Sequence, residues 1–163
     1  MNPLDLDPID LQLLARLQVD ASLSNQALAE LVHVSPPTCL RRVKRLVEAG
    51  LIEREIAILS VDTLAQAIGH GLCALVEITL DRQDQDALLA FEKKVAPEDA
   101  VQQCYRVSPG PDFVLVIHVH DMPDYLALTQ RLFTTDANVR NVKSFFSIKR
   151  SKFGAAVPLP ASI

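Results

Sequence analysis

The sequence lacks several features that would place it in common classes of protein. No apolar run approaches the roughly 20 residues that span a membrane, and residues 1–5 do not have the pattern of a signal peptide. The 3 cysteines are odd in number and far apart, without the spacing of metal ligands. We therefore expect a soluble cytoplasmic protein with reduced thiols, no membrane contact, no metal and no cofactor.

Net positive charge is also lacking, because the formal net charge is -4 at pH 7. An acidic total does not exclude DNA binding, since phosphate is contacted by a local basic patch. Between residues 35 and 54, five cationic side chains stand against two acidic ones, which gives this stretch a balance of +3. The cationic side chains are those of Arg41, Arg42, Lys44, Arg45 and Arg54.

The basic stretch has the start and stop signals of a helix over residues 36–49. Ser35 is the predicted N-cap, with its hydroxyl accepting a backbone N–H of the first turn. Pro36 fits the first helical position, and Gly50 fits the left-handed residue that ends a helix. At about 100° per residue, one face is apolar and the opposite face is polar. The apolar face is expected to hold Leu40, Val43, Leu46 and Val47, and the polar face Thr38, Arg41, Arg42 and Arg45.

Two shorter helices are predicted before the basic one. Asp7 is expected to cap a helix over residues 7–19, with Asp10 in its first turn. Ser24 is expected to cap a second helix over 25–32, followed by a turn of about three or four residues. Two helices joined by a short turn, the second of them basic, predict a helix-turn-helix whose last helix lies in the major groove of DNA.

This interpretation gives the polar side chains of the basic stretch their roles. Guanidinium groups can bind guanine edges in two places at once, whereas Lys44 and Arg54 are expected to meet phosphate. The hydroxyls near the helix start are expected to contact a base or a phosphate. The predicted DNA-binding residues are Ser35, Thr38, Arg41, Arg42, Lys44, Arg45 and Arg54.

Downstream of Gly50 the pattern becomes extended and then repeats as strands and helices. Residues 51–59 alternate in part and predict a strand or wing, and from residue 71 the order βαββαβ predicts a ferredoxin-like module. Strands are expected over 72–80, 101–108, 113–120 and 139–149, and helices over 84–95 and 121–133. The fold class is therefore α+β, with a winged helix-turn-helix DNA-binding domain over 1–55, a linker strand and hinge over 56–70, and a βαββαβ domain with a C-terminal tail over 71–163.

One face of the predicted sheet is too apolar to face water alone, so we expect it to pair with another subunit. Its side chains are those of Leu75, Glu77, Val114, Val116 and His118. His118 and His120 alternate on one strand, but no carboxylate or thiol in ligand spacing accompanies them. A structural or interface role is therefore favoured for both histidines over a catalytic or metal-binding one.

Several stretches resemble the Lrp/AsnC family of transcription regulators, over about residues 4–150. The matching stretches include Leu28-Ala-Glu-Leu-Val, Val34-Ser-Pro-Pro-Thr-Cys-Leu-Arg-Arg-Val-Lys-Arg-Leu, Val76-Glu-Ile-Thr-Leu and Cys104-Tyr-Arg-Val-Ser. The resemblance implies that the first domain binds double-stranded DNA as a homodimer. It also implies that the second, RAM-type domain builds octamers or other even-numbered rings and senses a small effector, usually an amino acid.

The family's effector loop lies between the second and third strands of the βαββαβ unit, with a pattern close to Gly-Asp-aromatic-Asp. The same register here is Ser108-Pro-Gly-Pro-Asp-Phe, which keeps only the last acid. The resemblance implies effector contacts by Ser108, Gly110 and Asp112, with the Asp112 carboxylate meeting an ammonium group. Pro109 and Pro111 each remove a backbone donor for an effector carboxylate, which predicts an altered geometry.

Two other functions stay open beside that of a sequence-specific regulator. A nucleoid-type architectural protein would coat DNA with steep salt dependence and little sequence preference. Siroheme decarboxylases resemble the same two-domain architecture, but such an enzyme would bind a tetrapyrrole and dispense with the basic helix, which this chain retains. We therefore expect a regulator and not an enzyme.

Overall fold

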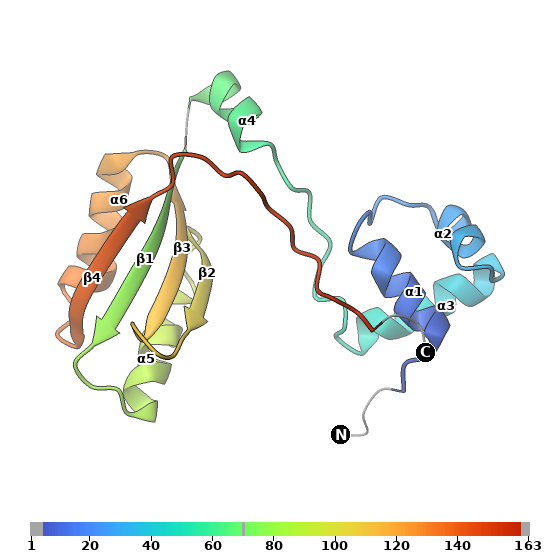
Figure 1. The fold of residues 1–163 in the computed structure, drawn as a ribbon, viewed down its shortest axis with the longest axis horizontal. Coiled ribbons are helices and arrows are strands. Elements are labelled where there is room, and N and C mark those ends of the chain that lie inside the picture. The colour runs from blue at the N-terminus through green and yellow to red at the C-terminus, as the bar shows by residue number, and fades with distance from the viewer. Residues whose placement is uncertain (1–4, 70, 161–163) are drawn as a thin grey trace. The chain divides into compact units, whose positions relative to one another are not determined.

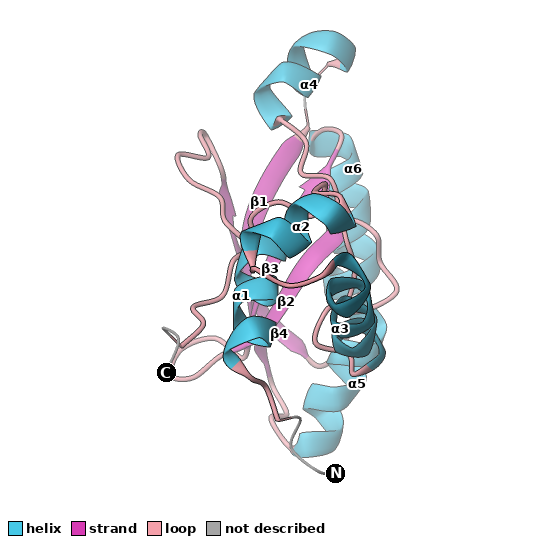
Figure 2. Ribbon diagram, turned by 90° about the vertical axis from the view of Figure 1, so that its right-hand side faces the viewer, coloured by secondary structure: helices cyan, strands magenta, loops and turns pink. Residues whose placement is uncertain are grey.

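The computed structural model describes residues 5–69 and 71–160 and divides them into two compact units. The first unit comprises the residues up to Ile58 together with those from Lys152 onward, and the second runs from Leu59 to Ser151. Figure 1 labels the helices and strands in chain order. Every strand among the described residues belongs to the second unit, and these strands are magenta in Figure 2.

The first unit contains the three predicted helices, which are α1 (Pro8–Leu17), α2 (Asn25–Leu31) and α3 (Pro36–Glu48). Asp7 caps α1 through its side chain, which accepts the backbone N–H of Asp10, and the Asp10 carboxylate accepts the N–H of Asp7 in return. This reciprocal capping box satisfies two donors that a helix start leaves free. Ser24 caps α2 as predicted.

A small apolar core holds the three helices together. Its buried members come from all three of them and are Leu13, Leu28, Ala29, Val32, Cys39 and Leu46. Burial raises the pKa of the Cys39 thiol, because the thiolate is disfavoured away from water. The prediction that Cys39 packs in the domain is therefore confirmed.

The predicted apolar face of α3 is only partly correct. Leu46 is fully buried, but the Leu40 side chain is 60% exposed and Val47 is 46% exposed. The helix is turned so that Cys39, Val43 and Leu46 face the core, with Arg42 beside them. Arg42, on the flank of α3 opposite Leu40, pairs with the buried Asp10 carboxylate of α1.

The start of α3 also differs from the prediction. Within the described part of the chain, the Ser35 hydroxyl caps no backbone N–H and instead hydrogen-bonds the Thr38 hydroxyl at 2.8 Å. Pro36 and Pro37 have no N–H to offer, so the first turn has few donors to satisfy.

The predicted strand or wing over residues 51–59 is not formed. Residues 51–60 are all described and contain no strand, since no neighbouring strand pairs with them in this chain. A helix that was not predicted follows, α4 (Val61–Ile68), capped by the Ser60 side chain and ended at Gly69 with φ 88. The serine before this segment and the glycine after it are typical of the two ends of a helix and could have predicted α4.

The residues from Lys152 onward belong to the first unit, and a side-chain amide holds them there. The Gln18 amide donates to the Val157 carbonyl at 3.1 Å and accepts the Val157 N–H at 3.0 Å. Gln18 is the C-cap residue of α1. One side chain thus satisfies both the N–H and the carbonyl of Val157 in the tail.

The second unit has the predicted βαββαβ order. Its elements are β1 (Leu72–Leu80), α5 (Gln85–Val95), β2 (Val101–Arg106), β3 (Phe113–Val119), α6 (Met122–Thr129), the π-helical turn η1 (Gln130–Thr134) and β4 (Val139–Phe146). The antiparallel sheet has the order β2-β3-β1-β4. Asp84 and Asp121 cap the two helices, so these starts are confirmed.

Alternation along the strands divides the sheet into two unlike faces. Side chains of β1 and β3 such as Val76, Ile78 and Leu115 are buried against α5 and α6, and Phe91 stacks on Phe113 with ring centroids 4.7 Å apart. On the other face Leu75 and Phe145 are neighbours in register and remain exposed. The helices therefore cover only one face of the sheet.

Replacing Gln18 by alanine should release the tail from α1. The Val157 amide loses its acceptor, so we expect its hydrogen exchange to become several times faster, as the loss of one exposed hydrogen bond predicts. Exchange measured by NMR on the full chain tests this, with Gln12→Ala on the same helix as a matched control. Unchanged exchange at Val157 in the Gln18 variant would contradict the docking.

Candidate DNA-binding surface and effector site

The structure separates the basic side chains of α3 into two groups. Arg41 and Lys44 are exposed, and Lys44 forms only a distant pair with Glu48, at 3.7 Å. The side chains of Arg42 and Arg45 point instead toward α1. Of the remaining predicted residues, Ser35 and Arg54 are exposed and Thr38 is half-buried.

A single buried carboxylate organises the inward-facing group. Asp10 is 0% exposed and is the buried polar side chain among the described residues. Its Oδ1 accepts from Arg42 Nη1 at 2.9 Å, and its Oδ2 pairs with Arg45. Arg42 Nη1 also reaches Asp7 Oδ2 at 2.7 Å. The carboxylate therefore links the first turn of α1 to the middle of α3.

Local electrostatics follow from this cluster. The Asp10 backbone N–H, and after it Arg42, hold the pKa of the Asp7 carboxyl below its usual range. Arg42 is locked in its charged form, because hydrogen bonds to Asp7 and Asp10 raise its pKa further. Arg42 Nε is buried, and none of the described residues accepts from it. Arg42 is thus committed to the interior of the unit.

The turn between α2 and α3 has a defined geometry. His33 lies in the left-handed region with φ 56, a conformation that ends α2. The Val34 N–H donates to the Ala29 carbonyl at 3.0 Å, and the Asn25 side chain donates to the Pro36 carbonyl at 2.9 Å. These hydrogen bonds fix the angle between α2 and α3, with one face of α3 exposed to solvent.

The predicted effector loop joins β2 to β3. Gly110 has φ 125, a conformation that side chains disfavour, which explains glycine at this place. Asp112 Oδ2 accepts from the Leu80 N–H at 2.7 Å and from Gln83 Nε2 at 3.1 Å. Ser108 is exposed. Asp112 therefore ties the loop to the end of β1 with one of its two oxygens.

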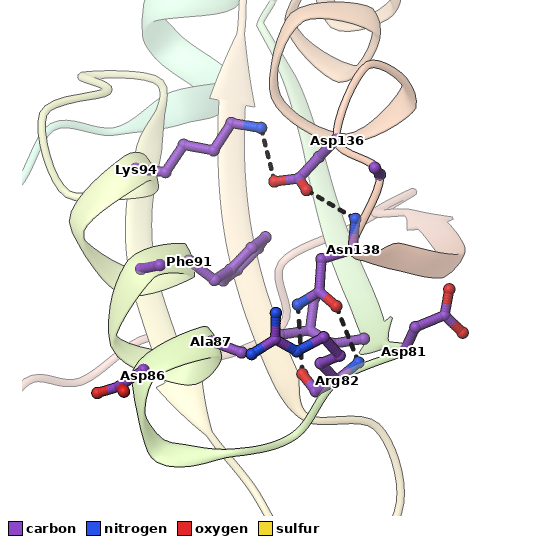
Figure 3. Close-up of a pocket in the computed structure, with 11 residues that line it drawn as sticks. Asp81, Arg82, Asp86, Ala87, Phe91, Lys94, Asp136 and Asn138 are labelled. Atoms are coloured by element: carbon purple, nitrogen blue, oxygen red, sulfur yellow. Dashed lines mark hydrogen bonds and ion pairs between the residues drawn. The ribbon is translucent and has the colours of Figure 1, made fainter.

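A pocket of about 620 Å³ lies next to the same end of β1 (Figure 3). Phe91 and Ala87 of α5 contribute an apolar wall, and Lys94 points across to Asp136 at 2.8 Å. The Asn138 side chain accepts the Arg82 N–H at 2.8 Å and donates to the Arg82 carbonyl at 3.2 Å. The segment after β1 is thus fixed by Asp112 and by Asn138.

His118 lies in β3 and His120 directly follows it, and the two side chains have different surroundings. His118 is half-buried, and burial lowers the pKa of its imidazole. His120 is exposed beside Asp121 and Asp124, with Nδ1 3.3 Å from Asp121 Oδ2. Asp121 uses its other oxygen to accept the Asp124 N–H, which begins α6. The acidic side chain nearest His120 thus serves the start of the helix.

Comparison with known proteins gives the family of both units. Residues 6–53 match the winged helix-turn-helix DNA-binding model, and residues 73–157 match the Lrp/AsnC ligand binding domain. The chain belongs to the Lrp/AsnC family. The resemblance of the sequence to that family is confirmed, as is the α+β fold with a DNA-binding and a ligand-binding part.

Relatives in the Lrp/AsnC family are similar over nearly the whole length. A leucine-responsive regulatory protein of Rhizobium meliloti is 33% identical over 95% of this chain and 97% of its own. The DNA-binding transcriptional activator DecR of Escherichia coli is 32% identical over 94% and 99%. These relatives are regulators, and the chain is a DNA-binding transcriptional regulator and not an enzyme.

Solved structures of Lrp/AsnC proteins have the same fold. A transcriptional regulator of Neisseria meningitidis, crystallised as an L-Met complex, has a TM-score of 0.81 at 28% identity, covering 96% of this chain and 98% of that one. An AsnC family regulator of Agrobacterium tumefaciens has a TM-score of 0.80 at 27% identity, covering 94% and 97%. No helix in the described ranges is long and apolar enough to cross a membrane.

Sequence reasoning missed the part that Asp7 and Asp10 play in this Lrp/AsnC protein. Both were assigned to the helix start alone, whereas they also hold the arginines of α3. One signal was available, because Asp10 follows Ile9 inside the apolar stripe of α1, where an acid is expected only with a partner. Local sequence patterns could not predict that Arg42 is this partner, because it lies 32 residues away from Asp10.

Replacing Asp10 by alanine should destabilise the first unit by about 3 kcal/mol, because the largely buried Arg42 loses its buried partner and Arg45 loses its ion pair. Urea unfolding of the full chain, followed by helical circular dichroism, measures the loss. Glu48→Ala is the matched control, since its exposed pair with Lys44 should contribute less than about 0.5 kcal/mol. Equal stability of the two variants would show that the Asp10 cluster does not hold α3.

Proposed function

We propose that α3 enters the major groove with Arg41 and Lys44 foremost. The observation that carries this proposal is the division of the basic side chains, since Asp10 retains Arg42 and Arg45 while Arg41 and Lys44 face solvent. Arg41 lies in the N-terminal half of the helix, the part of a recognition helix that contacts base edges. Its guanidinium group suits the two acceptors of guanine, and Lys44 suits phosphate.

The other predicted DNA contacts take supporting roles in this proposal. The Arg45 side chain is 45% exposed beside Asp10, so it can meet a phosphate without leaving the carboxylate. Ser35 and Thr38 share a hydrogen bond at the start of α3 and offer hydroxyls to the DNA backbone. Arg54, on the extended segment after α3, meets phosphate. Arg42 acts from the interior by fixing the rotation of the helix.

Replacing Arg41 by alanine should weaken binding to a selected operator by about tenfold, the cost of one bidentate base contact. A titration at fixed salt with fluorescent duplex DNA measures the change. Arg16→Ala removes the same charge from α1 and serves as the control. Equal affinity of the Arg41 variant and the wild type would refute the proposed groove contact.

We infer a homodimer for the working form, with the helix-free sheet face as the contact. Leu75 and Phe145 lie side by side on that face and are exposed, and Val114 and Val116 continue it as half-buried side chains. A second copy would cover these four apolar side chains. Dimers present two copies of α3 to half-sites about one helical turn apart, and even-numbered rings of dimers follow the family pattern. We also infer a cytoplasmic location, because a bacterial DNA-binding regulator needs access to the chromosome.

We further infer an amino acid as the effector, bound at the loop of Ser108, Gly110 and Asp112. The Neisseria relative carries L-Met, and residues 73–157 here match a ligand binding domain. Asp112 Oδ1 is the oxygen left to meet an ammonium group once Oδ2 has accepted from Leu80 and Gln83. The effector shifts the protein only if it binds one assembly or conformation better than another.

A thermal-shift screen of the twenty amino acids should find one that raises the melting temperature, because a ligand of the native state stabilises it. Asp112→Asn keeps an oxygen for the Leu80 N–H but loses the charge, so we expect normal stability without the shift. Asp112→Ala is the comparison, since it loses both and should melt lower. A full shift in the Asp112→Asn variant would disprove the ammonium contact.

A further inference from the structure

Leu40 is the most exposed of the large apolar side chains on α3. It lies on α3 at 60% exposure and is not part of the core that Cys39 and Leu46 form on the same helix. The hydrophobic effect disfavours such exposure, and nothing in the helix itself requires leucine there. Arg42, on the opposite flank of α3, is held inward by Asp10.

The position of Leu40 along the helix is as informative as its exposure. Leu40 precedes Arg41 directly and stands one turn after Pro37, which is also exposed, in the N-terminal half of α3. At about 100° per residue, Pro37 and Arg41 lie roughly opposite the Cys39–Leu46 stripe, and Leu40 lies next to them on one flank of it. A recognition helix contacts base edges with its N-terminal residues, so Leu40 faces the same groove as the Arg41 guanidinium group.

We propose that Leu40 is a specificity-determining residue that binds the C5-methyl group of a thymine in the operator. The major groove offers few apolar partners, and the thymine methyl is the one that distinguishes a base. Contact between this methyl and the leucine side chain removes both from water. The assignment rests on the proposed entry of α3 into the major groove. It predicts a thymine next to the guanine that Arg41 contacts in each half-site.

The test exchanges thymine for uracil, which removes the methyl group and leaves every hydrogen-bonding edge unchanged. A duplex selected from random DNA by the full-length protein serves as the site, and each thymine is replaced in turn. The wild type should lose about fourfold in affinity per half-site at one position, the factor for burying one methyl-sized group. The Leu40→Ala variant should bind the thymine and uracil duplexes equally at that position.

Val47→Ala is the matched control, because Val47 is an exposed apolar residue on the same flank about 10 Å farther along the axis. It should keep the thymine-to-uracil ratio of the wild type. Unchanged melting temperatures of both variants establish that folding is intact, as expected for exposed side chains. The proposal is overturned if no thymine is sensitive in the wild type, or if Leu40→Ala retains the wild-type ratio.

The Arg41→Ala variant on the same duplexes separates this proposal from the one beneath it. If Arg41→Ala binds as tightly as the wild type, the groove contact of α3 itself is wrong. If Arg41→Ala is weakened while uracil has no effect on the wild type, α3 lies in the groove and the role of Leu40 alone is refuted.

Discussion

The Asp10 carboxylate is the constraint on which the DNA-binding unit depends. A carboxylate removed from water costs several kcal/mol unless its oxygens are paired, and here each oxygen has an arginine of α3. Because the two arginines lie three residues apart on one helix, satisfying them fixes the rotation of α3 about its axis. The inward Arg42 and the outward Arg41 go with this rotation, and the capping box at the start of α1 uses the same carboxylate.

The ligand-binding unit uses a carboxylate in a comparable way. Asp112 accepts from the end of β1 and thereby sets the course of the loop between β2 and β3, while Asn138 fixes the same segment from the other side. Backbone groups at the end of a strand are thus satisfied by side chains and not by solvent. This leaves a loop of defined shape between β2 and β3.

The two units are connected twice by the chain, once near residue 58 and again near residue 151, where the chain returns to the first unit. The returning tail is held at Val157 by the Gln18 amide at the end of α1. A DNA-binding unit attached by two segments has less conformational freedom than one on a single linker.

Local signals in the sequence determined the capped starts of α1, α2, α5 and α6, the βαββαβ order and the family, because caps and apolar periods depend on neighbouring residues. They did not determine which arginines of α3 are exposed and which pair with a buried carboxylate. A helical wheel places Arg42 and Leu40 on either side of the Cys39–Leu46 stripe, and both flanks are compatible with burial. Only the tertiary contact with Asp10, 32 residues earlier than Arg42, decided between them. The sequence by itself thus defined the basic helix between Ser35 and Gly50, and long-range pairing of a buried charge decided which face it shows.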